Sequence, residues 1–134
     1  MSEQHTGKIL VVDDEQSLLT VMEAYLTRLG YEVVACRAGE EAWAAFEGSP
    51  ESFNMVLADM TLPEMSGSAL LSKMVELNPG IRILICSGYP FDSSTLPATH
   101  RPLIGFLQKP FTPRMLADSL QQLEAIHDGG GAGA

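Results

Sequence analysis

Five side chains that can take part in chemistry follow short apolar runs of the sequence: Asp13, Asp14, Asp59, Ser87 and Lys109. Three carboxylates held side by side repel one another, and each raises the cost of ionising the others. A hard divalent cation with oxygen ligands and bound waters removes that repulsion, and Mg²⁺ suits such a site. The hydroxyl and the ammonium add a hydrogen-bond donor and a fixed positive charge, which a tetrahedral oxyanion requires. Together these groups predict phosphoryl transfer to an aspartate.

The elements that must position these residues alternate between strand and helix. Apolar runs predict strands over 9–12, 31–35, 55–58, 83–86 and 104–107, and helical spacing predicts helices over 16–30, around 42–46, over 69–77 and from 113 onward. The last helix has the clearest start, because Thr112 can act as N-cap and Pro113 suits the first helical position. Its predicted buried stripe is Leu116, Leu120 and Leu123. Strands separated by helices predict a parallel sheet covered on both faces, and ligands bind at the carboxyl ends of its strands, where the five reactive side chains converge.

Each reactive residue also has an ordinary structural interpretation. An Asp-Asp pair after an apolar run is typical of a solvated turn, and a single Asp can simply end a strand. A Ser-Gly pair is a routine turn, and a Lys before Pro is a routine surface charge. Their joint occurrence at the ends of successive predicted strands favours one shared site.

The segments outside this regular pattern are expected to be irregular. Three prolines between residues 90 and 102 interrupt the helix that the alternation would place there, so we expect a short or irregular element. We expect a flexible N-terminus over residues 1–7, one domain over 8–127, and a disordered Gly/Ala tail over 128–134.

The composition narrows the class of protein. A chain of 134 residues that is 46% hydrophobic is long enough for one domain with its own core. Its 8 Lys+Arg against 17 Asp+Glu give a net charge of −9, which argues against binding to nucleic acid or to an anionic membrane. No apolar stretch approaches the ~20 residues of a membrane span, and residues 1–7 do not resemble a signal peptide, so we expect a cytoplasmic protein. Cys36 and Cys86 lack metal-site spacing and are expected in the core.

Four short motifs surround the reactive residues: ILVVDDE from Ile9, DMTLPEMSG from Asp59, SGY from Ser87 and KPF from Lys109. In this order they resemble the receiver domain of two-component response regulators, and the resemblance covers about residues 7 to 126. It implies a flavodoxin-like α/β fold, doubly wound around a five-stranded parallel sheet of order 2-1-3-4-5. It also implies a regulatory phosphoacceptor domain and not a turnover enzyme. Asp59 would receive a phosphoryl group from a sensor histidine kinase or a histidine phosphotransfer protein.

The resemblance assigns a role to each residue of the site. The Mg²⁺ ligands would be two carboxylates, a backbone carbonyl and a carboxylate that acts through water: Asp14, Asp59, Met60 and Asp13. Ser87 and Lys109 would contact the phosphoryl oxygens, and the Lys109–Pro110 peptide is similar to one that is cis in the family. In the implied switch, Ser87 moves toward the phosphoryl group and Phe106 turns inward to fill the vacated space.

Two positions differ from the charged residues found in the family, and two motifs indicate which kind of receiver this chain resembles. Thr61 and Tyr89 occupy positions that tune loss of the phosphoryl group in the family, and neither is charged here, so no lifetime of the phosphorylated state is implied. The SGY and FLQKPF motifs look more like receivers attached to hybrid sensor kinases than like DNA-binding regulators. The output partner stays unknown.

Three other classes of function fit parts of the pattern. A receiver-like module that is never phosphorylated usually lacks one of the key residues, and all of them are present here. A phosphohydrolase that forms an aspartyl-phosphate would carry Asp-x-Asp on its first strand, where this chain has Asp13-Asp14-Glu15. A flavin-binding domain of the same fold would need a Gly/Ser/Thr-rich loop after that strand, which this chain lacks.

Overall fold

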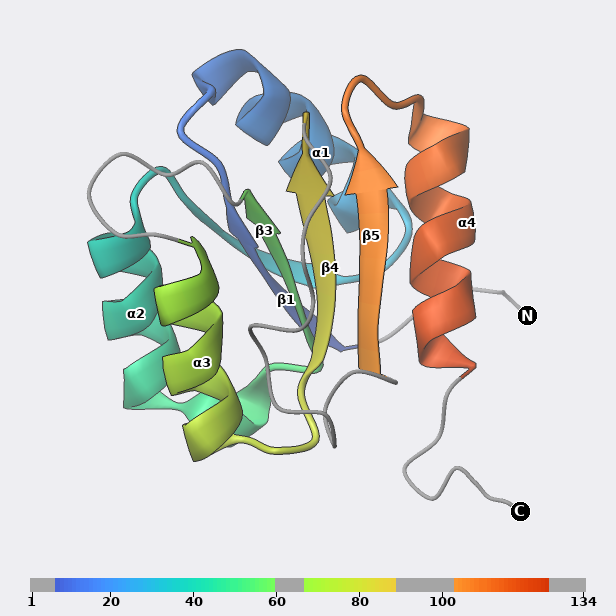
Figure 1. The fold of residues 1–134 in the computed structure, drawn as a ribbon. Helices are drawn as coiled ribbons and strands as arrows, with labels where there is room; N and C mark the ends of the chain where they lie inside the picture. Colours follow the sequence, from blue (N-terminus) through green and yellow to red (C-terminus); the bar gives the residue numbers. More distant parts are fainter. Residues whose placement is uncertain (1–6, 60–66, 89–102, 126–134) are drawn as a thin grey trace.

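Five parallel strands form the sheet at the centre of the fold (Figure 1). The computed structural model describes residues 7–59, 67–88 and 103–125, and the strands are β1 (Lys8–Val12), β2 (Glu32–Cys36), β3 (Met55–Asp59), β4 (Arg82–Ser87) and β5 (Ile104–Gln108). Their order is β2-β1-β3-β4-β5, and every pairing is parallel. The predicted flavodoxin-like, doubly wound α/β fold and its strand order are therefore confirmed.

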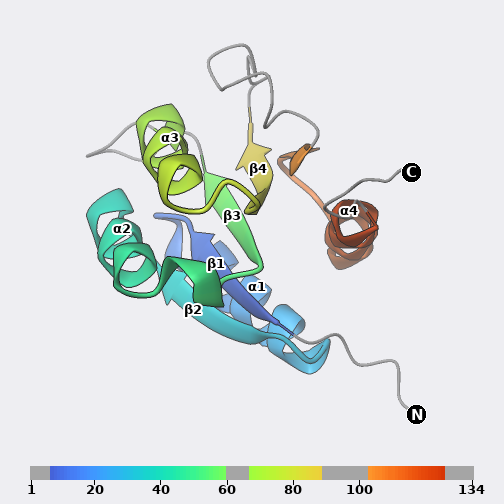
Figure 2. The same cartoon turned by 90° about the horizontal axis from the view of Figure 1, so that it is seen from below.

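Helices cover both faces of the sheet (Figure 2). On one face lie α1 (Gln16–Arg28) and α4 (Pro113–Glu124), and on the other lie α2 (Gly39–Gly48) and α3 (Gly67–Leu77), with the 3₁₀ turn η1 (Pro50–Ser52) after α2. A buried apolar cluster fills the space between the sheet and each helical layer. Within the described ranges, no helix is long and apolar enough to cross a membrane.

The interior strand β1, which lies between β2 and β3, shows why the strands appear in the sequence as continuous apolar runs. Ile9 and Val11 pack in the cluster beneath α1 and α4, whereas Leu10 and Val12 pack in the cluster beneath α2 and α3. None of the four is more than 1% exposed. A strand covered on both faces has no polar side, so its alternation of polar and apolar residues disappears.

The end of α1 determines where the second strand begins. Gly30 has a φ of 108°, the left-handed conformation that commonly ends a helix. The Tyr31 amide then donates back to the Leu26 carbonyl at 3.2 Å. Tyr31 therefore still belongs to the turn, and the strand expected from residue 31 begins at Glu32.

The buried face of α1 consists of Leu19, Met22 and Leu26, whereas the neighbouring Leu18 is only half-buried. Both leucines fit a 3.6-residue repeat with the later apolar positions, so the spacing alone does not choose between them. Packing against the sheet selects Leu19.

The N-terminus of α4 gives a first testable prediction. The Thr112 hydroxyl accepts a hydrogen bond from the Met115 amide at 3.1 Å, which confirms the predicted cap. We expect Thr112→Ala to lower the free energy of unfolding by about 1 kcal/mol, because it leaves that amide without its partner. Thr112→Ser is the matched control and should keep most of the stability in urea denaturation. Equal losses in the two variants would contradict a capping role.

The cysteines are both buried and free, as expected of core residues. Several sequence predictions fall on positions that lie outside the described residues: Met60, Thr61, Tyr89, the segment 90–102, residues 1–6 and the tail 128–134.

Candidate functional site

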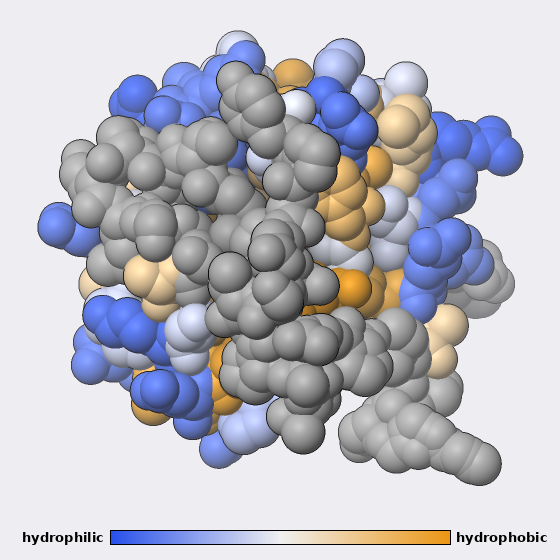
Figure 3. All heavy atoms as spheres, in the orientation of Figure 1, coloured by the Kyte–Doolittle hydropathy of each residue, from blue (hydrophilic) through white to orange (hydrophobic). Residues whose placement is uncertain are grey.

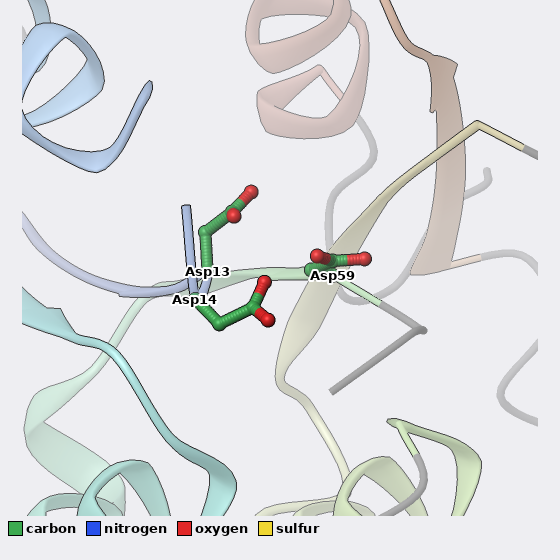
Figure 4. Close-up of side chains that lie close together, drawn as sticks. All are labelled: Asp13, Asp14 and Asp59. Carbon is green, nitrogen blue, oxygen red and sulfur yellow. The ribbon is translucent and has the colours of Figure 1, made fainter. Parts of the chain in front are cut away.

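Three carboxylates meet at the carboxyl ends of β1 and β3 (Figure 4). Asp13 and Asp14 follow β1 directly, and Asp59 is the last residue of β3. One carboxylate oxygen from each lies within 4.8 Å of the others. Asp13 and Asp59 are 1% and 3% exposed, whereas Asp14 is exposed. The three acids predicted to share a site therefore do so, and two of them are withdrawn from solvent.

Asp13 is held from several sides. Its backbone amide donates to the Cys36 carbonyl at 3.1 Å, which ties it to the end of β2. Its Oδ1 accepts the Glu15 amide at 2.9 Å, and its Oδ2 accepts Lys109 Nζ at 2.8 Å. The contacts of Asp13 with Glu15 and Cys36 could not be predicted from the sequence, because both depend on how the turn after β1 is folded.

Lys109, which follows β5, places its ammonium beside the acidic residues that follow β1 and β3. Its backbone amide donates to the Ser87 carbonyl at 2.8 Å, and the Lys109–Pro110 peptide bond is cis, as the resemblance implies. Its Nζ lies 2.8 Å from Asp13 Oδ2 and 3.4 Å from Asp59 Oδ2. One ammonium thus pairs with both buried carboxylates.

The electrostatics of the site follow from this burial. Removal from water raises the pKa of Asp13 above its ordinary value, although the hydrogen bonds from Lys109 and Glu15 oppose the change, and the charge of Asp59 raises the pKa further. Burial favours the neutral form of Lys109, but the hydrogen bond to Asp13 and the charges of both carboxylates outweigh it and raise its pKa. Lys109 therefore stays charged at neutral pH.

Three ionised carboxylates exceed the charge of one ammonium by two units, which a divalent cation would balance. The donor set consists of hard carboxylate oxygens, which suit Mg²⁺. Asp14 contributes an exposed carboxylate and Asp59 a buried one, whereas both oxygens of Asp13 already accept hydrogen bonds from the Glu15 amide and Lys109. The residues present therefore fit a Mg²⁺ site.

Ser87 and Phe106 lie on the neighbouring strands. Ser87 ends β4 and is 2% exposed, and Phe106 in the middle of β5 is 42% exposed. Cys86 lies opposite Asp59 in the β3–β4 register, and burial raises the pKa of its thiol to about 12, with Lys109 opposing that change. A thiol protonated at neutral pH takes the structural role that we expected for it.

The fold and the site together define a class of protein: a doubly wound α/β domain with an acidic cation site and a fixed ammonium at its strand ends. The family model of the response regulator receiver domain matches residues 9–121. The chain is 33% identical over 114 residues to the transcriptional regulatory protein ZraR of Salmonella typhimurium, which covers 85% of this chain and 25% of that protein. It is 32% identical over 120 residues to the sensor kinase CckA of Brucella abortus, covering 88% of this chain and 12% of the kinase.

Solved structures agree with the family match. A CheY-like receiver domain protein from Methanospirillum hungatei is 29% identical, with a TM-score of 0.77, over 90% of this chain and 96% of that one. This chain thus spans a quarter or less of the two curated relatives but nearly all of the solved domain. The chain belongs to the response regulator receiver domain family, and it is a regulatory phosphoacceptor domain of two-component signalling. Receiver domains bind Mg²⁺ and interact with histidine kinases or phosphotransfer proteins.

The raised pKa of Asp13 predicts how Mg²⁺ and pH act on stability. The folded protein holds that proton more tightly than the unfolded chain, so in metal-free protein this contribution favours folding at low pH and is lost as pH rises through the folded pKa. Mg²⁺ binds the ionised carboxylates, so at neutral pH it should stabilise the protein by about 2.7 kcal/mol at a hundredfold excess over Kd. The gain should shrink as pH falls toward the ordinary Asp pKa, about 4.

Thermal unfolding with and without MgCl₂ across this pH range tests the prediction. Asp13→Asn should remove the part of the pH dependence that belongs to Asp13. A Mg²⁺ effect of equal size at every pH would contradict it.

Proposed function

We propose that Asp59 is the phosphoacceptor of this receiver domain and that it accepts the phosphoryl group from a phosphohistidine in a Mg²⁺-dependent reaction. One contrast between the two buried acids carries the assignment: Asp13 has its two oxygens bound by the Glu15 amide at 2.9 Å and by Lys109 Nζ at 2.8 Å, whereas Asp59 lies at the longer distance of 3.4 Å from Lys109 Nζ and within 4.8 Å of two other acids. The nucleophile thus has a cation and a set of metal ligands close to it. Both are needed where negative charge gathers on a transferred phosphoryl group.

Each residue has a distinct part in the proposed reaction. Asp14, Asp59 and the backbone carbonyl of Met60 would hold Mg²⁺, which screens the negative charges that repel each other when the donor approaches. Asp13 would act through a water, a role that agrees with its two oxygens already being hydrogen-bonded. An Asp59 oxygen attacks phosphorus, the bond from phosphorus to the donor imidazole nitrogen breaks, and that nitrogen regains a lone pair. Lys109 and Ser87 would donate to the phosphoryl oxygens.

The proposed switch lies on the face of the sheet that carries Ser87. In the β4–β5 register Ile85 lies opposite Phe106, and Ser87 follows two residues later on the same face. Hydrophobic residues reach the surface near β5 on the face drawn in Figure 3. Phe106, in the middle of β5, is 42% exposed. When Ser87 turns toward the phosphoryl group, Phe106 would move inward into the space that it leaves. Phosphorylation would thereby change the surface that an output partner meets.

Uptake of a single phosphoryl group from a small donor tests the function. The chain is incubated with acetyl phosphate and MgCl₂, or with the same donor and a chelator, and its intact mass is measured. We expect one added phosphoryl group with Mg²⁺ and none with the chelator. No uptake from acetyl phosphate or from a histidine kinase would indicate a receiver-like module that is never phosphorylated. Steady release of phosphate from p-nitrophenyl phosphate would instead favour a phosphohydrolase.

A further inference from the structure

Gln108 lies directly beside Ser87 on the neighbouring strand. The β4–β5 register places these two residues opposite each other, at the last position of both strands. The next amide along β5, that of Lys109, donates to the Ser87 carbonyl at 2.8 Å and fixes this end of the ladder. The position of Gln108 relative to Ser87 is therefore set by the backbone.

The two side chains leave the sheet on the same face. Ile83 and Ile85 of β4 and Ile104 of β5 pack with the cluster beneath α2 and α3, whereas Cys86 and Leu107 pack beneath α1 and α4. Since side chains alternate along a strand, Ser87 and Gln108 both fall on the α2 and α3 side. Neighbouring strands are about 4.8 Å apart, a gap that the flexible arm of a glutamine spans easily.

The chemistry of the two groups is complementary. A serine hydroxyl has one proton to donate and two lone pairs to accept, and a glutamine carboxamide has two N–H groups to donate. The Gln108 side chain is exposed, and no hydrogen bond joins it to another residue of the described chain. Strand β4 lies between β3, which ends at Asp59, and β5, which ends at Gln108, so Gln108 lies on the side of Ser87 opposite to Asp59.

We propose that Gln108 is a positioning residue for phosphoryl transfer: once the phosphoryl group is on Asp59 and Ser87 donates to it, the Gln108 carboxamide N–H donates to Ser87 Oγ and thereby holds the hydroxyl proton on the phosphoryl oxygens. The inference rests on the proposed function and adds a residue to it. Gln108 does not touch the reacting atoms and acts only through Ser87. One neutral hydrogen bond of this kind changes a rate by about three- to tenfold.

The test measures the rates of phosphoryl uptake and of phosphoryl loss with acetyl phosphate as donor. Gln108→Leu keeps the bulk of the side chain and removes its donors, so we expect both rates to fall by about three- to tenfold. Gln121→Leu makes the same change at an exposed position of α4 and should leave both rates as in wild type. An unchanged thermal midpoint in both variants shows that the fold is retained.

A double-mutant cycle with Ser87→Ala separates positioning from a general structural effect. If Gln108 acts through Ser87, Gln108→Leu has no further effect once Ser87 is alanine. An equal loss in both backgrounds overturns the inference, and so does a Gln108→Leu variant with wild-type rates. Absence of any uptake by wild type overturns the proposed function and this inference with it.

Discussion

Asp59→Asn should take up no phosphoryl group from any donor, yet be at least as stable as wild type when no metal is present. The first effect follows because an amide is a very poor nucleophile toward phosphorus, and phosphorylation is lost outright if Asp59 is the acceptor. The second follows from the geometry of the site. Asp59 is 3% exposed, and its charge works against ionisation of Asp13, so the substitution removes one of two buried charges that share Lys109.

The measurements are intact mass after incubation with acetyl phosphate and Mg²⁺, and thermal unfolding in the presence of a chelator. Asp118→Asn, an exposed substitution on α4, is the matched control and should keep wild-type uptake. We also expect Mg²⁺ to stabilise Asp59→Asn less than wild type, because one ligand has lost its charge. Continued uptake by Asp59→Asn would place the acceptor elsewhere, with Asp13 or Asp14 as the next residue to substitute.

The sequence could predict this site because parallel topology determines where strand ends meet. Once five strands alternate with helices, residues as distant as Asp13 and Lys109 must come to one edge, whatever the details of packing. The same reasoning located Asp59 and Ser87 to within one residue of the observed strand ends. Long-range convergence of this kind depends only on the order and direction of the strands.

Features that depend on individual atoms could not be predicted in the same way. Nothing in the sequence indicates that the Glu15 amide binds Asp13, or that a single ammonium serves both buried acids. These contacts depend on turn geometry and on rotamers that the whole fold determines. The position of Gln108 beside Ser87 could be predicted only in part. The sequence predicts that β4 and β5 are neighbours, but it does not determine their register to a single residue, and that register places Gln108 opposite Ser87.

The opposing charges in the site also explain why stability and function are coupled in this domain. Burying Asp13 and Asp59 costs free energy, and Lys109 offsets that cost only in part, because its one charge is shared between two acids. The same excess of negative charge is what attracts a divalent cation. A site optimised for stability alone would have fewer acids and would bind the metal less well.

Lys109→Met should therefore lose both phosphoryl transfer and stability, by two separable routes. Loss of a preorganised donor to the phosphoryl oxygens should lower the rate of uptake by about a hundredfold or more. Loss of the cation removes the positive charge that Lys109 holds beside the buried Asp13 and Asp59, which should cost about 3–5 kcal/mol at neutral pH. The loss of stability should be smaller at low pH, because burial raises the pKa of Asp13 and that acid becomes protonated as the pH falls.

Lys73→Met is the matched control, because Lys73 is exposed and its Nζ lies 4.5 Å from the centre of the Trp43 ring, on the α2 and α3 face. That variant should keep wild-type uptake and lose less than about 1 kcal/mol. Excess Mg²⁺ separates the two roles of Lys109, since the ion can neutralise the carboxylates but cannot replace the N–H donors. Mg²⁺ should therefore restore most of the stability of Lys109→Met in thermal unfolding and leave its uptake defective. If Mg²⁺ restored both properties, Lys109 would serve only to balance charge, and its assigned contact with the phosphoryl group would be wrong.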